Sequence, residues 1–157
     1  MTIGLIAIAV SIIALLYAGY LSWRVMKAPT GSQEMQDIAQ AIREGAIAYL
    51  ARQYRTIAIF AVIITGLLYW LFGTPVAVGF LFGAILSGLS GYIGMSISVR
   101  ANVRTAETAK NGLQAALDVA FKGGSVTGMA VVGLALLAVS VMYVIFPYPK
   151  LLIGLGF

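Results

Sequence analysis

Hydrophobic and charged positions are segregated into long blocks along this chain. Three runs contain no Asp, Glu, Lys or Arg, and they cover residues 1–23, 56–99 and 123–149. A helix needs about 20 apolar residues to cross the hydrocarbon layer of a bilayer, so each run can supply one crossing and the middle run can supply two. The pattern therefore predicts an all-α, polytopic transmembrane bundle with four spans, at about 3–23, 50–72, 76–100 and 125–146.

The second span is preceded by an amphipathic segment. Across residues 35–53, apolar and small side chains recur at helical spacing and charged residues lie between them. Thr30 or Ser32 can cap the first turn of a helix that starts here. The pattern predicts one long helix that is amphipathic at first and enters the membrane near Thr56.

Glycine and proline mark the other boundaries. The sequence "GTP" at residues 73–75 predicts a tight hairpin between the second and third spans. The sequence "PYPK" ends the fourth span, and the apolar "LLIGLGF" at 151–157 follows it. Seven residues cannot cross a bilayer, so we interpret this stretch as the start of a truncated further helix. Residues 1–157 then form a single membrane-domain fragment.

Composition excludes an ordinary soluble domain. The chain is 61% hydrophobic and 10% charged, whereas soluble domains carry about 25% charged residues; its mean hydropathy is +1.00. It contains no cysteine and no histidine. Disulfides, thiolate or imidazole metal sites, and catalytic dyads or triads that need His or Cys are therefore excluded.

The distribution of basic residues predicts the orientation. Nine of the ten lie in or beside two segments, 24–49 and 101–124, and Lys150 alone lies on the other side. Cytoplasmic loops retain Lys and Arg, so both segments are predicted to be cytoplasmic loops and the N-terminus to be outside. This explains the net charge of +5 without a nucleic-acid partner. The nine are Arg24, Lys27, Arg43, Arg52, Arg55, Arg100, Arg104, Lys110 and Lys122.

Four charged residues, Arg100, Arg104, Glu107 and Lys110, follow the third span at helical spacing. They can form a charge ladder on a helix that continues out of the membrane. One interpretation is an anion or phosphate site. The other, which we favour, is a solvated helix end whose charges set the topology.

Carboxylates offer little chemistry in this sequence. All five lie in the two predicted cytoplasmic segments and none lies within a span, where a pump would keep an ion-relay carboxylate. Glu34 and Asp37 could share a cation, but acidic residues at a helix start more often compensate its dipole. No phosphate loop of the G-x-x-x-x-G-K type is present. We predict no catalytic, cofactor-binding or metal-binding residue in the chain.

Small residues recur every fourth position along the third span. Such spacing lets helix backbones approach closely, so we interpret the stripe as a packing surface rather than the lining of a channel. Two glycines at the start of the fourth span are predicted to act in the same way. The residues are Gly79, Gly83, Ser87 and Gly91, then Ala84 and Gly88 on the adjacent face, and Gly124 and Gly128.

Three stretches resemble the N-terminal signatures of the membrane-bound, ion-pumping inorganic pyrophosphatases. They are the "EGA-AYL-RQY" core at residues 44–54, the "AN-RT" turn at 101–105 and "AF-GG-V-G" at 120–128. The resemblance covers nearly the whole chain. It implies four outer-ring helices of a larger all-helical protein whose inner ring carries the catalytic and gate motifs, none of which occurs in this sequence.

The resemblance also implies the activity of the complete protein. Members of this family hydrolyse pyrophosphate with magnesium, in some cases with potassium, and move protons or sodium ions out of the cytoplasm, generally as homodimers. It implies a multi-pass protein of the cell inner (plasma) membrane, or of an acidic-organelle membrane in a eukaryote. This chain alone is expected to be inactive.

Two non-enzymatic alternatives remain from the residues themselves. One is a small four-helix membrane scaffold. The other is an oligomeric transporter, which would need a charged residue facing the bundle interior, and the run 56–99 supplies none.

Overall fold

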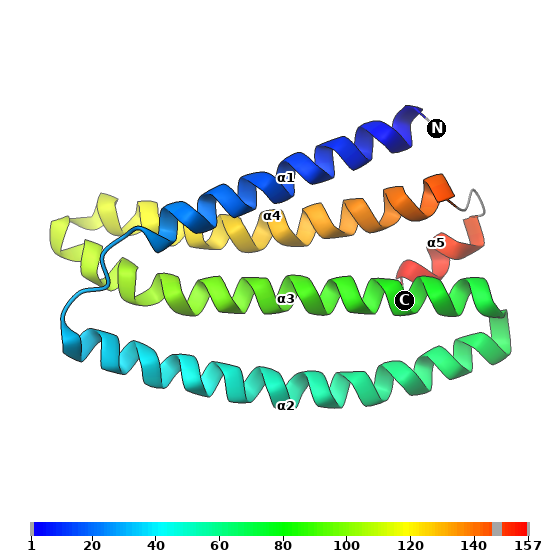
Figure 1. Ribbon diagram of the computed structural model, residues 1–157, viewed down its shortest axis with the longest axis horizontal. Coiled ribbons are helices and arrows are strands. Elements are labelled where there is room, and N and C mark those ends of the chain that lie inside the picture. The colour runs from blue at the N-terminus through cyan, green and yellow to red at the C-terminus, as the bar shows by residue number, and fades with distance from the viewer. Residues whose placement is uncertain (1, 146–148, 157) are drawn as a thin grey trace.

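A computed structural model describes residues 2–145 and 149–156, and Figure 1 shows the arrangement of its helices. Four helices are long and apolar enough to cross a membrane, and the described residues contain no strand. The predicted all-α bundle of four potential spans is thus confirmed. The helices are α1 (Thr2–Met26), α2 (Gln33–Phe72), α3 (Thr74–Thr108), the 3₁₀ turn η1 (Ala109–Asn111), α4 (Leu113–Ile145) and α5 (Pro149–Gly156).

Two of the predicted helix boundaries are observed. The amphipathic segment and the second span form one continuous helix, α2, capped by Ser32, whose hydroxyl accepts a bond from the Met35 N–H. Gly73 separates α2 from α3, with φ at +81°. A residue with a Cβ rarely adopts this conformation, which explains glycine at the hairpin.

The charged segment 101–124 is helical for most of its length. Helix α3 continues to Thr108 and α4 begins at Leu113, so the chain reverses within one 3₁₀ turn. The break is at Gly112, whose φ is +106° and whose N–H bonds to the Ala109 carbonyl. Charged residues indicate where a helix leaves an apolar layer, but backbone hydrogen bonds continue into water until a residue such as glycine ends them.

Helices α1, α4, α3 and α2 lie side by side in that order (Figure 1). Helix α4 packs on both α1 and α3, and Val126, fully buried, lies in a cluster with Ala18, Leu21 and Ile97. Small residues permit the close approach. A Cβ on Gly94 would lie 2.7 Å from a methyl of Thr127. The core is therefore built on α4, with α1 and α3 on either side.

Helix α2 is attached along α3 alone among the described elements. Leu68 is its one buried residue among those described, and it joins a small cluster on α3 beside the hairpin. Further along, the Tyr54 hydroxyl donates a hydrogen bond of 2.7 Å to the Gly88 carbonyl. Most of the surface of α2 is left exposed.

The sequence 151–157 falls in α5, which is helical to Gly156 and packs on the beginning of α3. A Cβ on Gly83 would lie 2.9 Å from the Leu155 carbonyl oxygen. The predicted end of the fourth span at residue 146, Pro147 after it and the last residue lie outside the described residues.

The glycine predictions have a mixed outcome. On α3, Gly79 is buried, and Gly83 and Gly91 each approach a neighbouring helix, so packing is confirmed at these positions. It is not observed at Ser87, which is exposed, or at Gly88, where a Cβ would meet nothing within 4 Å. On α4 the prediction is wrong within the described structure, since a Cβ on Gly124 or Gly128 would meet nothing within 4 Å. The glycine that packs is Gly123, where a Cβ would lie 2.9 Å from that of Ala101.

Candidate functional site

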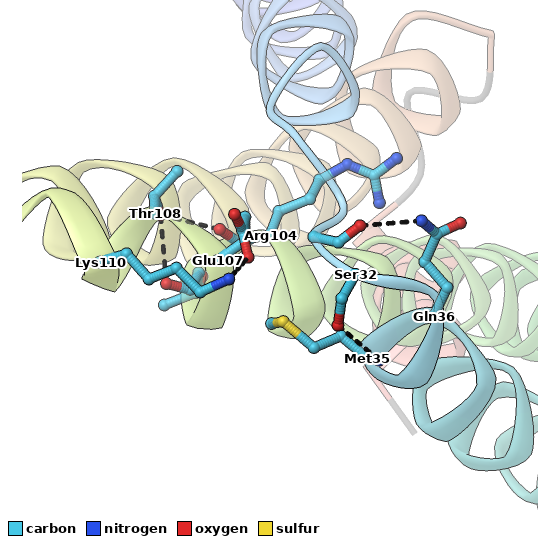
Figure 2. A network of polar contacts seen from close by, with 9 residues as sticks. Ser32, Met35, Gln36, Arg104, Glu107, Thr108 and Lys110 are labelled. Carbon is cyan, nitrogen blue, oxygen red and sulfur yellow. Dashed lines mark hydrogen bonds and ion pairs between the residues drawn. The ribbon is translucent and has the colours of Figure 1, made fainter.

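The predicted charge ladder lies where the α1–α2 connection crosses the end of α3. The connection is folded tightly on itself (Figure 2): the Gln36 side chain donates a hydrogen bond of 3.0 Å to the Gly31 carbonyl. Gly31 has a φ of +79°. This turn brings the start of α2 against α3.

Arg104 is buried, with 9% of its surface exposed. One terminal nitrogen donates to the Arg100 carbonyl at 2.7 Å, and the other donates to the Met26 carbonyl at 3.4 Å. Figure 2 shows the side chain leaving α3 on the side away from Glu107 and Lys110. The prediction that Arg104 belongs to a solvated charge ladder is therefore wrong: it fastens the end of α1 to α3.

The rest of the ladder is observed. Lys110 pairs with Glu107 at 2.5 Å. Glu107 also packs against the connection, because a Cβ on Gly31 would lie 2.6 Å from its carboxylate. The exposed pair contributes about 0–1 kcal/mol to stability, as surface pairs do. Its main effect is therefore to hold the Glu107 carboxylate in place beside the connection.

Arg104 is incompletely satisfied within the described residues. Its Nε is buried and has no hydrogen-bond partner there, and neither carbonyl that it contacts carries a formal charge. Removing a guanidinium from water costs several kcal/mol unless a charge or a set of hydrogen bonds compensates it. The buried end of this cluster is therefore electrostatically positive.

Arg104 forms one wall of a pocket of about 230 Å³ between the α1–α2 connection, α2 and α3. Arg43 reaches it from α2 and Arg100 from α3, while Thr30, Gln36 and Gln40 add neutral polar groups. No carboxylate lines it among the described residues. The structure thus brings Arg100 and Arg104, which were singled out together, to one pocket, and adds Arg43.

Three of the carboxylates each contact a different neighbouring side chain. Asp37 accepts a hydrogen bond from Gln33, and Glu44 accepts one from Gln40. Asp118 pairs with Lys122 on the other side of the α3–α4 turn. Within 2–145 and 149–156, no three His, Cys, Asp or Glu side chains are grouped to hold a metal. Glu34 lies in the first turn of α2, where an acidic residue compensates the helix dipole. That the chain holds no metal-binding residue stays a prediction.

The burial of Arg104 could have been predicted from the spacing of residues along α3, although the distribution of charges did not indicate it. The buried face of α3 follows steps of four and three residues: Ser90, Gly94, Ile97, Ala101, Arg104 and Thr108. That is the spacing of a helix seam that faces its neighbours. Arg104 lies on this seam, whereas Arg100, half-buried, lies beside it.

Comparisons with known proteins place the chain among relatives. The family model described as "Inorganic H+ pyrophosphatase" matches residues 12–157. The chain is 51% identical to a K(+)-insensitive pyrophosphate-energized proton pump of Methanosarcina mazei, over 93% of this chain and 22% of the relative. It is 54% identical to one of Moorella thermoacetica, over 86% and 20%. It is 42% identical to a putative K(+)-stimulated pyrophosphate-energized sodium pump of Clostridium tetani, over 89% and 21%. The chain spans about a fifth of the length of these relatives.

Proposed function

This chain belongs to the inorganic H+ pyrophosphatase family, and we propose that it supplies the outer-ring membrane helices of an ion pump driven by pyrophosphate hydrolysis. The observation that carries the proposal is the match over residues 12–157. Helices α1, α3 and α4, which pack through small residues, are suited to a wall of closely spaced membrane helices.

Protons are the proposed cargo. The relatives from Methanosarcina mazei and Moorella thermoacetica are both named as K(+)-insensitive proton pumps, and their identities of 51% and 54% exceed the 42% of the putative sodium pump. Sodium is the second candidate, and it rests on that third relative. The named proton pumps are K(+)-insensitive and the named sodium pump is K(+)-stimulated. We therefore expect potassium to stimulate the pump only if its cargo is sodium.

The catalytic and ion-gate residues are proposed to lie outside this chain. Asp37, Glu44 and Asp118 each contact a different neighbouring side chain, and no group of three His, Cys, Asp or Glu side chains that could hold a metal occurs among the described residues. In the complete protein, metal-bound pyrophosphate would be hydrolysed by residues of other helices. The partners we propose are those helices, pyrophosphate, the bilayer and a second copy of the pump.

The proposed orientation follows from the basic residues. The connection between α1 and α2 and the turn between α3 and α4 lie at one end of the bundle (Figure 1), and the Lys and Arg residues are concentrated there. We propose that this end is cytoplasmic in the plasma membrane. Single-cysteine labelling at Lys110 in intact cells should fail unless the membrane is opened. Labelling from outside would contradict the orientation while leaving the family unchanged.

The function is tested with the full-length protein reconstituted in sealed vesicles. Pyrophosphate and magnesium should release phosphate and acidify the vesicle interior, and a proton ionophore should abolish the gradient without stopping hydrolysis. Ionophore-resistant sodium-22 uptake would favour sodium. Hydrolysis without any ion gradient would contradict pumping, and no hydrolysis would favour the non-enzymatic scaffold.

A further inference from the structure

We propose that the pocket lined by Arg43, Arg100 and Arg104 binds the phosphate group of an anionic phospholipid. The acyl chain of that lipid would lie along the adjoining groove between α2 and α3. The inference needs the helices to lie in a membrane, but it does not depend on pyrophosphate hydrolysis or pumping.

Charge complementarity is the first argument. Three guanidinium groups from two helices line one pocket, and no carboxylate is among its lining residues. Nearby acidic side chains are occupied elsewhere: Glu107 by Lys110, Asp37 by Gln33, and Glu44 by Gln40. In the part of the chain that is described, the ion pairs do not include these arginines. Arginine forks match phosphate oxygens bidentately, so an anion with several oxygens fits this pocket.

Burial is the second argument. Arg104 is 9% exposed, and its Nε lacks a partner among the described residues. A buried cation with neutral partners raises the positive potential around it, and this potential is screened less than that of a surface charge. Arg43 is exposed and Arg100 is half-buried, so both can contact a ligand that enters the pocket from solvent. Arg104 lines the buried side of the same pocket.

The neighbouring surface favours a lipid over free phosphate. A second cavity adjoins the basic pocket on the side of the apolar spans, and the two share Arg43, Val99 and Arg100. Its other walls include Ala46, Ile47 and Leu50 from α2, with Tyr92 and Met95 from α3. A phosphate ion would gain nothing from an apolar groove. An acyl chain that lies in the groove would bury its apolar surface away from water, which is favourable.

The position also suits a headgroup. Arg100 is the first charged residue after the run 56–99, so the pocket lies where α3 leaves its apolar segment. Basic pockets between membrane helices at this depth bind anionic headgroups. The placement follows from the sequence and holds whichever side of the membrane the pocket faces.

The test measures lipid binding to the full-length protein, stripped of lipid in neutral detergent. Phosphatidylglycerol should bind and phosphatidylcholine should bind more weakly, as counted by native mass spectrometry. Arg43→Gln and Arg100→Gln should each weaken phosphatidylglycerol binding about fivefold, the effect of one basic residue near an anionic lipid. Arg52→Gln is the matched control, because Arg52 is an exposed arginine of the same helix that does not line the pocket; it should change binding less than twofold.

A second variant separates the two sources of phosphate. Ala46 lines the groove on the side of the spans but not the basic pocket, so Ala46→Trp should weaken lipid binding and leave any binding of inorganic phosphate or pyrophosphate unchanged. Equal binding of both lipids would overturn the proposal. So would arginine variants no weaker than Arg52→Gln, or displacement by millimolar phosphate with no effect of Ala46→Trp.

Discussion

Helices α2 and α4 are both long and apolar, yet they are packed very differently. Helix α4 lies between α1 and α3 and buries ten of its 33 residues, whereas α2 buries Leu68 alone among 40. Both pass the length and hydropathy requirement for a membrane span. Hydropathy therefore does not distinguish a helix at the centre of the bundle from one at its edge.

The difference lies in where small residues occur. The buried positions of α4 advance by three and four residues and include small side chains throughout: Ala116, Val119, Gly123, Val126, Ala130 and Gly133. Helix α1 buries Gly4, Ser11, Ala18, Leu21 and Val25 at compatible spacing. In lipid, helix association depends on close packing, because the hydrocarbon surrounds either arrangement equally well. A seam of small residues at this spacing thus allows a helix to pack closely against two neighbours and to lie at the centre of the bundle.

The largest effect is expected from filling the α3–α4 seam. Gly123→Leu places a side chain where a Cβ already meets the Cβ of Ala101 at 2.9 Å, and two β-carbons cannot rotate away from each other. We expect a loss of about 3 kcal/mol, the upper end for overpacking, measured by unfolding in mixed micelles. Gly124→Leu is the adjacent control and should cost little. A similar cost at Gly124 would indicate that a helix from outside the described residues covers that face.

A smaller effect is expected from the polar tether between α1 and α3. Arg104→Leu removes the hydrogen bonds to the Met26 and Arg100 carbonyls. These bonds are worth about 2 kcal/mol, since bonds from a charged donor are worth more than neutral ones. The substitution also removes a buried charge, so the net loss should be about 1 kcal/mol. Hydrogen exchange at residues 26–32 should accelerate. Lys110→Met removes an exposed pair from the same helix end and should cost about 0.3 kcal/mol; an equal cost would contradict the difference in burial.

The smallest effect is expected on α2. Tyr54→Phe deletes the hydrogen bond to the Gly88 carbonyl, and interhelical bonds in membranes average about 0.6 kcal/mol. Crosslinking between cysteines placed in α2 and α3 near this bond should become less efficient. Tyr49→Phe, at an exposed position of α2, should leave both quantities unchanged. A cost at Tyr49 equal to that at Tyr54 would mean that α2 is held by other contacts.

The four long helices could be predicted because placing a charge in hydrocarbon is costly, so membrane spans are visible in the sequence as long runs without charged residues. The cap at Ser32 and the break at Gly73 were also predicted, since each is a local backbone requirement. The continuation of α3 beyond Arg100 was predicted from the helical spacing of its charges. The early start of α4 at Leu113 was not, because charges mark the end of an apolar environment rather than the end of a helix.

The polar cluster was predicted only in part. Arg100 and Arg104 were assigned to one solvated face, but four residues turn a helix about 40° beyond a full circle. That rotation moves Arg104 into the seam and leaves Arg100 beside it. Arg43 could not be joined to them from spacing within α3, because it lies on α2, and only the packing of α2 along α3 brings it to the same pocket. Such a pocket depends on tertiary packing.

The length of α2 has a mechanical consequence. At 1.5 Å per residue, its 40 residues form a rod of about 60 Å, roughly double the 30 Å thickness of bilayer hydrocarbon. At the tilts of up to about 40° that membrane helices adopt, a rod of that length extends beyond the lipid. Since α2 packs on α3 alone among the described helices, the tight α1–α2 connection holds its Gln33 end, and loosening that connection would release about 30 Å of helix outside the hydrocarbon.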